Sequence, residues 1–206
     1  MSSLIFETSK KRAFVATDTL AVALGGKPVR FTNKAIFLPH IRTIIAVTGF
    51  AGILTRWSLF INDHLSSRGI EHLNGLAPAA LSSIWKAFIE DFPCLAGSMI
   101  TTTVYHFGFS ETEDFIRSFA YRSTSDFQSD PLPYGIALKP ECDVPLTGDL
   151  KKVMESQRAI QGALPEDERL HIGGEIIVYD LREGGCLIST LDRFDDYDEM
   201  EIAMRK

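Results

Sequence analysis

The sequence predicts an α+β fold, on two observations. Its strand-like runs come in consecutive pairs joined by polar turns, and its helical segments are grouped between those pairs. Neighbouring runs joined by short turns form antiparallel hairpins, and grouped helices favour α+β over a parallel α/β sheet. The expected order is four strands, two helices, a strand pair, a helix and a final strand pair.

The first fifty residues carry the four strands. Two apolar runs, Leu4–Phe6 and Ala13–Ala16, flank the polar turn Lys10–Arg12, which is a hairpin pattern. After a longer loop rich in glycine the chain returns as a third run, Lys34–Leu38. A fourth run, Thr43–Val47, then ends at a Thr-Gly pair.

The middle of the chain predicts two helices and a hairpin. Apolar residues recur at helical spacing over Ala51–Arg68 and again over Pro78–Asp91, where Pro78 suits a first turn. Ser98–Phe109 is dense in strand-forming residues, and Phe115–Tyr121 is its expected partner.

The last third begins with a stretch that lacks periodicity, Arg122–Leu146, which predicts a long loop with one short strand-like run. Gly148–Leu164 predicts a third helix. Gly174–Asp180 and Cys186–Leu191 predict the last hairpin. The acidic tail, Asp192–Glu201, is interpreted as a solvated terminus or, as an alternative, an edge contact between subunits.

Composition narrows the class of protein. The 206 residues carry a net charge of −6, with 45% hydrophobic and 23% charged residues, which suits one globular domain spanning residues 1–206. The charge gives no basis for a nucleic-acid surface, and no apolar run approaches the ~20 residues of a membrane helix. The start lacks a signal-peptide pattern, and Cys94, Cys142 and Cys186 lack metal-type spacing. We therefore expect a cytoplasmic protein with reduced thiols, no metal and no cofactor.

Three polar residues mark the ends of the early strands: Ser2, Asp18 and Lys34. With the stretches Val15–Thr19 and Ala46–Gly52, they resemble the proteasome β-subunit and the bacterial HslV-type protease, both N-terminal-nucleophile (Ntn) hydrolases. In that family a nucleophile opens the first strand, an aspartate closes the second and a lysine opens the third. The resemblance returns at Ile172–Glu175, which is similar to the family's Ser-Gly-Gly approach to a late strand. It implies two antiparallel sheets stacked face to face, with helices outside both: a four-layer αββα sandwich.

The resemblance also implies a chemistry. Ser2 would be the nucleophile after Met1 is removed, and its own α-amino group, with a reference pKa of about 7.7–8.0, would be the base. Lys34 would supply positive charge, Asp18 would hold Lys34 in position, and backbone amides at Gly49 would form the oxyanion hole. A peptide or amide substrate, a homo-oligomer and an ATPase partner of unknown kind follow from the same resemblance.

A second interpretation stays open beside the hydrolase. Asp18 and Lys34 could form a surface ion pair worth ~0–1 kcal/mol. The family's second aspartate and serine fall on Arg169 and Ile172, which cannot make the same hydrogen bonds. The family's Gly-Ser-Gly turn is absent from the loop, where candidate serines exist by residue type only. The alternative is a non-catalytic assembly or binding subunit of the same fold. The candidate serines are Ser123, Ser125 and Ser129.

Overall fold

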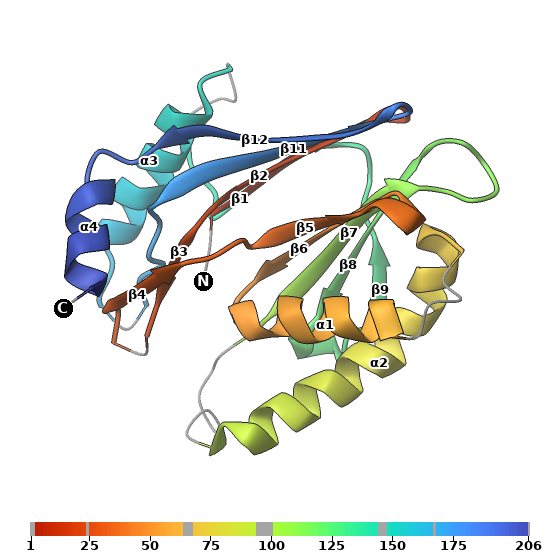
Figure 1. The fold of residues 1–206 in the computed structure, drawn as a ribbon, viewed down its shortest axis with the longest axis horizontal. Helices are drawn as coiled ribbons and strands as arrows, with labels where there is room; N and C mark the ends of the chain where they lie inside the picture. Colours follow the sequence, from red (N-terminus) through yellow and green to blue (C-terminus); the bar gives the residue numbers. More distant parts are fainter. Residues whose placement is uncertain are drawn as a thin grey trace.

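The computed structural model describes residues 3–23, 25–63, 68–93, 101–143, 148–166 and 168–205 (Figure 1). These residues form four α-helices and three sheets, and every strand pair is antiparallel. The expected α+β class is confirmed. The predicted elements occur in the expected order, with β3, β4, β9 and the C-terminal helix α4 added to them.

The first five-stranded sheet has the order β10-β1-β2-β11-β12. The predicted opening hairpin is its centre, with Leu4 of β1 opposite Thr17 of β2. The predicted last hairpin joins it through β11, which pairs with β2 so that Ile176 lies opposite Asp18. Its strands are β1 (Leu4–Thr8), β2 (Arg12–Asp18), β10 (Gly135–Lys139), β11 (Glu175–Arg182) and β12 (Gly185–Arg193).

The second five-stranded sheet has the order β5-β6-β7-β8-β9. It contains the third and fourth predicted strands and the predicted middle hairpin, while residues 94–100 lie outside the described part. Its strands are β5 (Ala35–Leu38), β6 (Thr43–Thr48), β7 (Thr103–Phe109), β8 (Ile116–Arg122) and β9 (Ser129–Pro131).

Two stretches expected to be loops contain strands. The glycine-rich segment after β2 forms a small hairpin of β3 (Leu20–Val22) and β4 (Pro28–Phe31). In the long loop, β10 contains the short strand-like run predicted at 136–138, whereas β9 was not predicted; both lie at sheet edges. The unpredicted strands are three or four residues long and mostly half-buried or exposed, so little apolar patterning marks them in the sequence.

The second helix starts earlier than predicted. α1 covers Ala51–Asp63 and α2 covers Ile70–Asp91, with Pro78 inside α2 instead of at its start. The Glu111 carboxylate accepts the backbone N–H groups of Glu71 and His72, at 3.0 and 2.8 Å. Because these first-turn amides have no partner within the helix, a carboxylate from elsewhere in the chain extends the helix backward.

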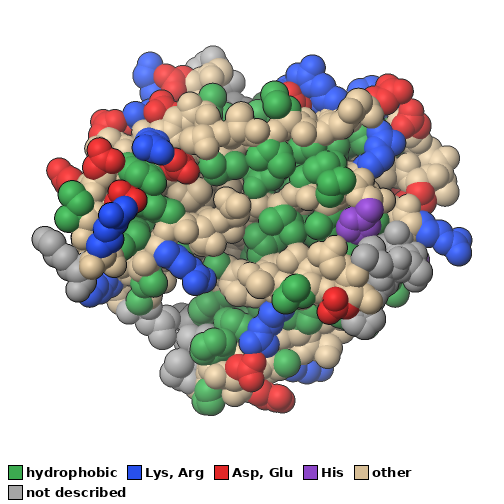
Figure 2. Space-filling model, in the orientation of Figure 1, with side chains coloured by type: hydrophobic (Ala, Val, Ile, Leu, Met, Phe, Trp, Pro, Cys, Tyr) green, Lys and Arg blue, Asp and Glu red, His purple; other side chains and the backbone are tan. Residues whose placement is uncertain are grey.

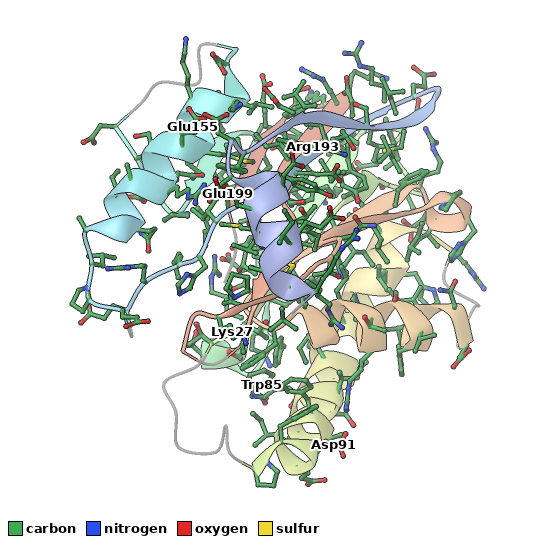
Figure 3. The ribbon with its side chains drawn as sticks, turned by 60° about the vertical axis from the view of Figure 1, so that its left-hand side comes forward. Lys27, Trp85, Asp91, Glu155, Arg193 and Glu199 are labelled. Atoms are coloured by element: carbon green, nitrogen blue, oxygen red, sulfur yellow. The ribbon has the colours of Figure 1, made fainter. Side chains whose placement is uncertain are left out.

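The C-terminal tail is folded and paired with α3, although most of its side chains are exposed. α3 (Leu150–Gly162) has the predicted position, and α4 (Tyr197–Met204) lies beside it. Asp195 and Asp196 pair with Lys151 and Arg158 of α3, which neutralises part of the acidic run. Figure 3 shows α4, marked by Glu199, next to α3, marked by Glu155.

Three apolar clusters join these elements. One contains residues of both five-stranded sheets, including Phe6 and Phe107. A second lies between the β5–β9 sheet and α1 and α2, around Trp57. The third lies between the β1–β2 hairpin and α3, around Met154. Figure 1 shows α1 and α2 along one sheet and α3 and α4 beside the other. No helix in the described ranges is long and apolar enough to cross a membrane.

Candidate functional site

Three of the four predicted site residues are described, and each lies where a strand begins or ends. Asp18 is the last residue of β2, Lys34 directly precedes β5, and Gly49 directly follows β6. Ser2, together with Met1, lies outside the described residues. The Lys34 Nζ is 2.7 Å from Asp18 Oδ1, so the pair joins the two five-stranded sheets.

The Asp18–Lys34 pair is buried, so its interpretation as a surface ion pair is wrong. The side chains of Lys34 and Asp18 are 5% and 0% exposed. Burial lowers the pKa of Lys34 below its ordinary value, and the Asp18 carboxylate acts in the opposite direction. The Lys34 ammonium therefore releases its proton more readily than an exposed lysine does.

Two backbone amides complete the environment of Asp18. Its Oδ1 accepts the N–H of Ser3 at 2.9 Å in addition to the lysine, and its Oδ2 accepts the N–H of Gly173 at 3.0 Å. Donors from three separate segments thus converge on one carboxylate. A buried ion pair is tolerated when further hydrogen bonds satisfy its lone pairs, as they do here.

Ser3 and Gln157 belong to the same site, and the sequence analysis missed both. The Ser3 hydroxyl donates to Gln157 Oε1 at 2.6 Å, and Gln157 Nε2 donates to the Pro140 carbonyl. Both side chains are fully buried. A polar residue on the buried stripe of α3, in line with Val153 and Met154, was the available signal for Gln157.

Gly49 forms a tight turn after β6. Its φ of +107° is one that residues with a side chain rarely adopt, and a Cβ there would lie 2.5 Å from the Thr101 carbonyl oxygen. Thr102 Oγ1 donates to the Thr48 carbonyl at 2.8 Å, and Ser123 Oγ accepts the Thr102 N–H at 3.0 Å. Of the three candidate serines, Ser123 is therefore the one bonded to the segment beneath this turn.

The late Gly-Gly motif lies against the end of β2. The Gly173 carbonyl accepts the N–H groups of Thr19 and Leu20, and the N–H of Glu175 donates to Thr19 Oγ1 at 2.8 Å. Gly174 has a φ of +83° and contacts Thr19 closely, so a side chain does not fit there. This motif holds the aspartate in place through the backbone.

The residues on the two degenerate positions of that motif have structural partners instead. Arg169 donates from Nε and a terminal nitrogen to the Leu164 carbonyl, at 3.2 and 2.8 Å. Ile172 is 2% exposed and belongs to the cluster under α3. Neither residue hydrogen-bonds to Asp18 or Lys34.

Metal chemistry and comparisons with known proteins add no further site. Among the described residues, no group of three or more His, Cys, Asp or Glu side chains is placed to hold a metal ion. The two described cysteines, Cys142 and Cys186, are free thiols, and Cys94 lies outside the described part. The chain matches no protein-family model and no curated protein sequence.

Proposed function

We propose that the chain is an Ntn-type amide or peptide hydrolase whose nucleophile is Ser2, exposed as the first residue when Met1 is removed. The observation that carries this proposal is the buried Asp18–Lys34 pair, hydrogen-bonded to the N–H of Ser3. Ser2 is joined to that same nitrogen by its peptide bond. The residue that follows the proposed nucleophile is therefore hydrogen-bonded to the ion pair.

The arrangement of the clusters supports the corresponding architecture. One apolar cluster contains residues of both five-stranded sheets. The other two clusters lie beneath α1 and α2, and beneath α3. We infer the layer order helix, sheet, sheet, helix, which is that of the Ntn sandwich. The ion pair then joins the end of β2 to the residue before β5, and these strands lie in the two inner layers.

The chemistry needs no group beyond these residues and water. The Ser2 hydroxyl attacks the substrate carbonyl carbon and gives its proton to the α-amine of the same residue. That proton passes to the leaving amine as the C–N bond breaks and an ester forms on Ser2. Water, deprotonated by the same amine, then hydrolyses the ester and restores the hydroxyl. The positive charge of Lys34 stabilises the alkoxide that develops during attack.

The backbone after β6 supports an oxyanion site. The Val47 N–H donates to the Lys34 carbonyl at 2.9 Å, so it points toward the β5 side. N–H groups two residues apart in a strand point the same way, and from this we infer that the amide of Gly49, directly after the end of β6, faces that side too. An amide donor beside the lysine is suited to an oxygen that gains negative charge.

The test is intact-mass analysis of the protein from its native host, with and without a hydroxyl-reactive β-lactone. We expect a chain that starts at Ser2 and gains one probe per chain. Ser2→Ala and Lys34→Ala are expected to lose the adduct, whereas Ser125→Ala, which changes an exposed serine bonded to the Arg122 carbonyl, keeps it. Full retention of Met1 in the native host would exclude this function.

The non-catalytic alternative has its own supporting observations. Arg169 and Ile172 replace the hydrogen-bonding residues of the late motif, and the edge strand β12 exposes Leu187, Ile188 and Leu191. Figure 2 shows hydrophobic side chains across the middle of one face, with charged groups toward its margins. Such surface suits contact with another subunit. A stable oligomer that starts at Ser2 but takes up no probe would favour this alternative.

A further inference from the structure

Ser3 makes one hydrogen bond through its backbone and one through its side chain. Its N–H donates to Asp18 Oδ1 at 2.9 Å, and its hydroxyl donates to Gln157 Oε1 at 2.6 Å. Ser3 and Gln157 are both fully buried, so water cannot substitute for either partner. The first bond ties Ser3 to the end of β2, and the second ties it to the middle of α3.

The direction of this chain of hydrogen bonds is fixed by its far end. The Pro140 carbonyl only accepts, so it must face the NH₂ group of the Gln157 amide. The Gln157 oxygen then faces Ser3, and the Ser3 hydroxyl must be the donor. A fixed amide orientation gives the serine one preferred rotamer, and this restricts the backbone at the start of β1.

We propose that Ser3 and Gln157 are positioning residues that place the terminal residue of the processed chain against the Asp18–Lys34 pair. The inference rests on the proposed function and deepens it, because it assigns to α3 the control of nucleophile geometry. Both side chains are buried, so neither is exposed to a substrate. Displacing reacting groups by ~1 Å can reduce a rate about 10²-fold, so a lost anchor one residue from the nucleophile has a large expected effect.

The experiment measures β-lactone labelling of Ser2 as a function of probe concentration in the processed full-length protein. Gln157→Leu and Ser3→Ala are each expected to lower the saturating rate at least about tenfold, with the half-saturating concentration unchanged. Ser3→Thr keeps the hydroxyl and restores labelling. The matched control is Gln161→Leu, since Gln161 is also buried on α3 but accepts the Leu170 N–H at 3.0 Å.

A double variant tests whether the two residues act through one hydrogen bond, and thermal unfolding separates an effect on positioning from an effect on stability. If both residues act through one hydrogen bond, Ser3→Ala with Gln157→Leu labels no more slowly than the slower single variant. Thermal unfolding of the same proteins is expected to fall comparably for Gln157→Leu and Gln161→Leu, while only the first slows labelling. Should Gln157→Leu not fold, the contrast between Ser3→Ala and Ser3→Thr decides the question.

The outcomes distinguish the two proposals. Labelling of Gln157→Leu or Ser3→Ala as fast as that of Gln161→Leu overturns the positioning role and leaves the hydrolase intact. A wild-type chain that starts at Ser2 and takes up no probe overturns the hydrolase, and the positioning role with it.

Discussion

Lys34 and His106 are both buried basic side chains, but their surroundings differ. Lys34 lies within 2.7 Å of a carboxylate that two backbone amides also contact. His106 accepts a hydrogen bond from Trp57 Nε1 at 2.8 Å, and its Nδ1 has no partner among the described residues. Burial lowers the pKa of both, that of His106 to about 3. Only Lys34 has a counter-charge.

The comparison distinguishes a buried base without a counter-charge from a buried base that is paired with a carboxylate. In the described part of the chain burial alone shifts the pKa of His106, which is a neutral ring packed with Trp57 and Tyr121. Around Lys34 the chain gathers hydrogen-bonding groups from three segments at the point where both sheets meet. Such a concentration of desolvated and paired groups is typical of functional sites, although structural ion pairs produce it too. Variants can test each half of this comparison.

The largest expected effect is that of Lys34→Met. The substitution keeps a long side chain but leaves the buried Asp18 carboxylate without its counter-charge, which costs about 3–5 kcal/mol of unfolding free energy. Urea denaturation at pH 7 measures this loss. Asp18→Asn combined with Lys34→Met removes both charges and should recover much of it. A loss below about 1 kcal/mol in the single variant would mean that the pair behaves as a solvated one.

Sequence reasoning located this pair because Asp18 closes one strand and Lys34 precedes another, because apolar runs in the chain mark both strands, and because the spacing fits a known pattern. It did not find Ser3 or Gln157, since their hydrogen bond depends on how α3 packs against β1. The start of α2 was also missed, because its cap, Glu111, lies about forty residues away. The folded state of the tail was missed for the same reason, since Asp195 and Asp196 pair with α3. Contacts distant along the chain account for each miss.

The second effect concerns His106 and pH. The unfolded chain binds a proton on this residue below its ordinary pKa of 6.5, and the folded chain does so only near its lowered pKa of about 3. Its contribution to stability is therefore complete above pH 6.5 and falls as the pH drops toward 3. Between pH 7 and pH 5 we expect the wild type to lose about 2 kcal/mol more than His106→Gln, which keeps an acceptor for Trp57. Equal losses in urea titrations would contradict a neutral, uncompensated ring.

A third variant tests whether the turn at Gly49, directly after β6, is rigid. Gly49→Ala places a Cβ 2.5 Å from the Thr101 carbonyl oxygen at a φ of +107°. Strain of this kind costs at least about 1 kcal/mol, to be measured as a lower melting temperature. The control is Gly184→Ala, where a Cβ meets no heavy atom within 4 Å. If the two variants have the same melting temperature, the turn after β6 relaxes freely and the Gly49 amide is not held toward Lys34.

The smallest expected effect comes from an ion pair that water reaches. Arg12 Nε lies 2.8 Å from Asp180 Oδ1, nearly the spacing of the buried pair, but the two side chains are 36% and 18% exposed. Asp180 keeps Arg182 as a partner at 2.9 Å, and Glu7, the other partner of Arg12 at 3.5 Å, is 46% exposed, so Arg12→Met leaves no buried carboxylate unpaired. We expect a loss of about 0–1 kcal/mol that shrinks further in 0.5 M salt, by roughly the amount that screening predicts. Urea denaturation at both salt concentrations measures it. A loss as large as that of Lys34→Met would show that the spacing of the charges, and not their burial, sets the strength of these pairs.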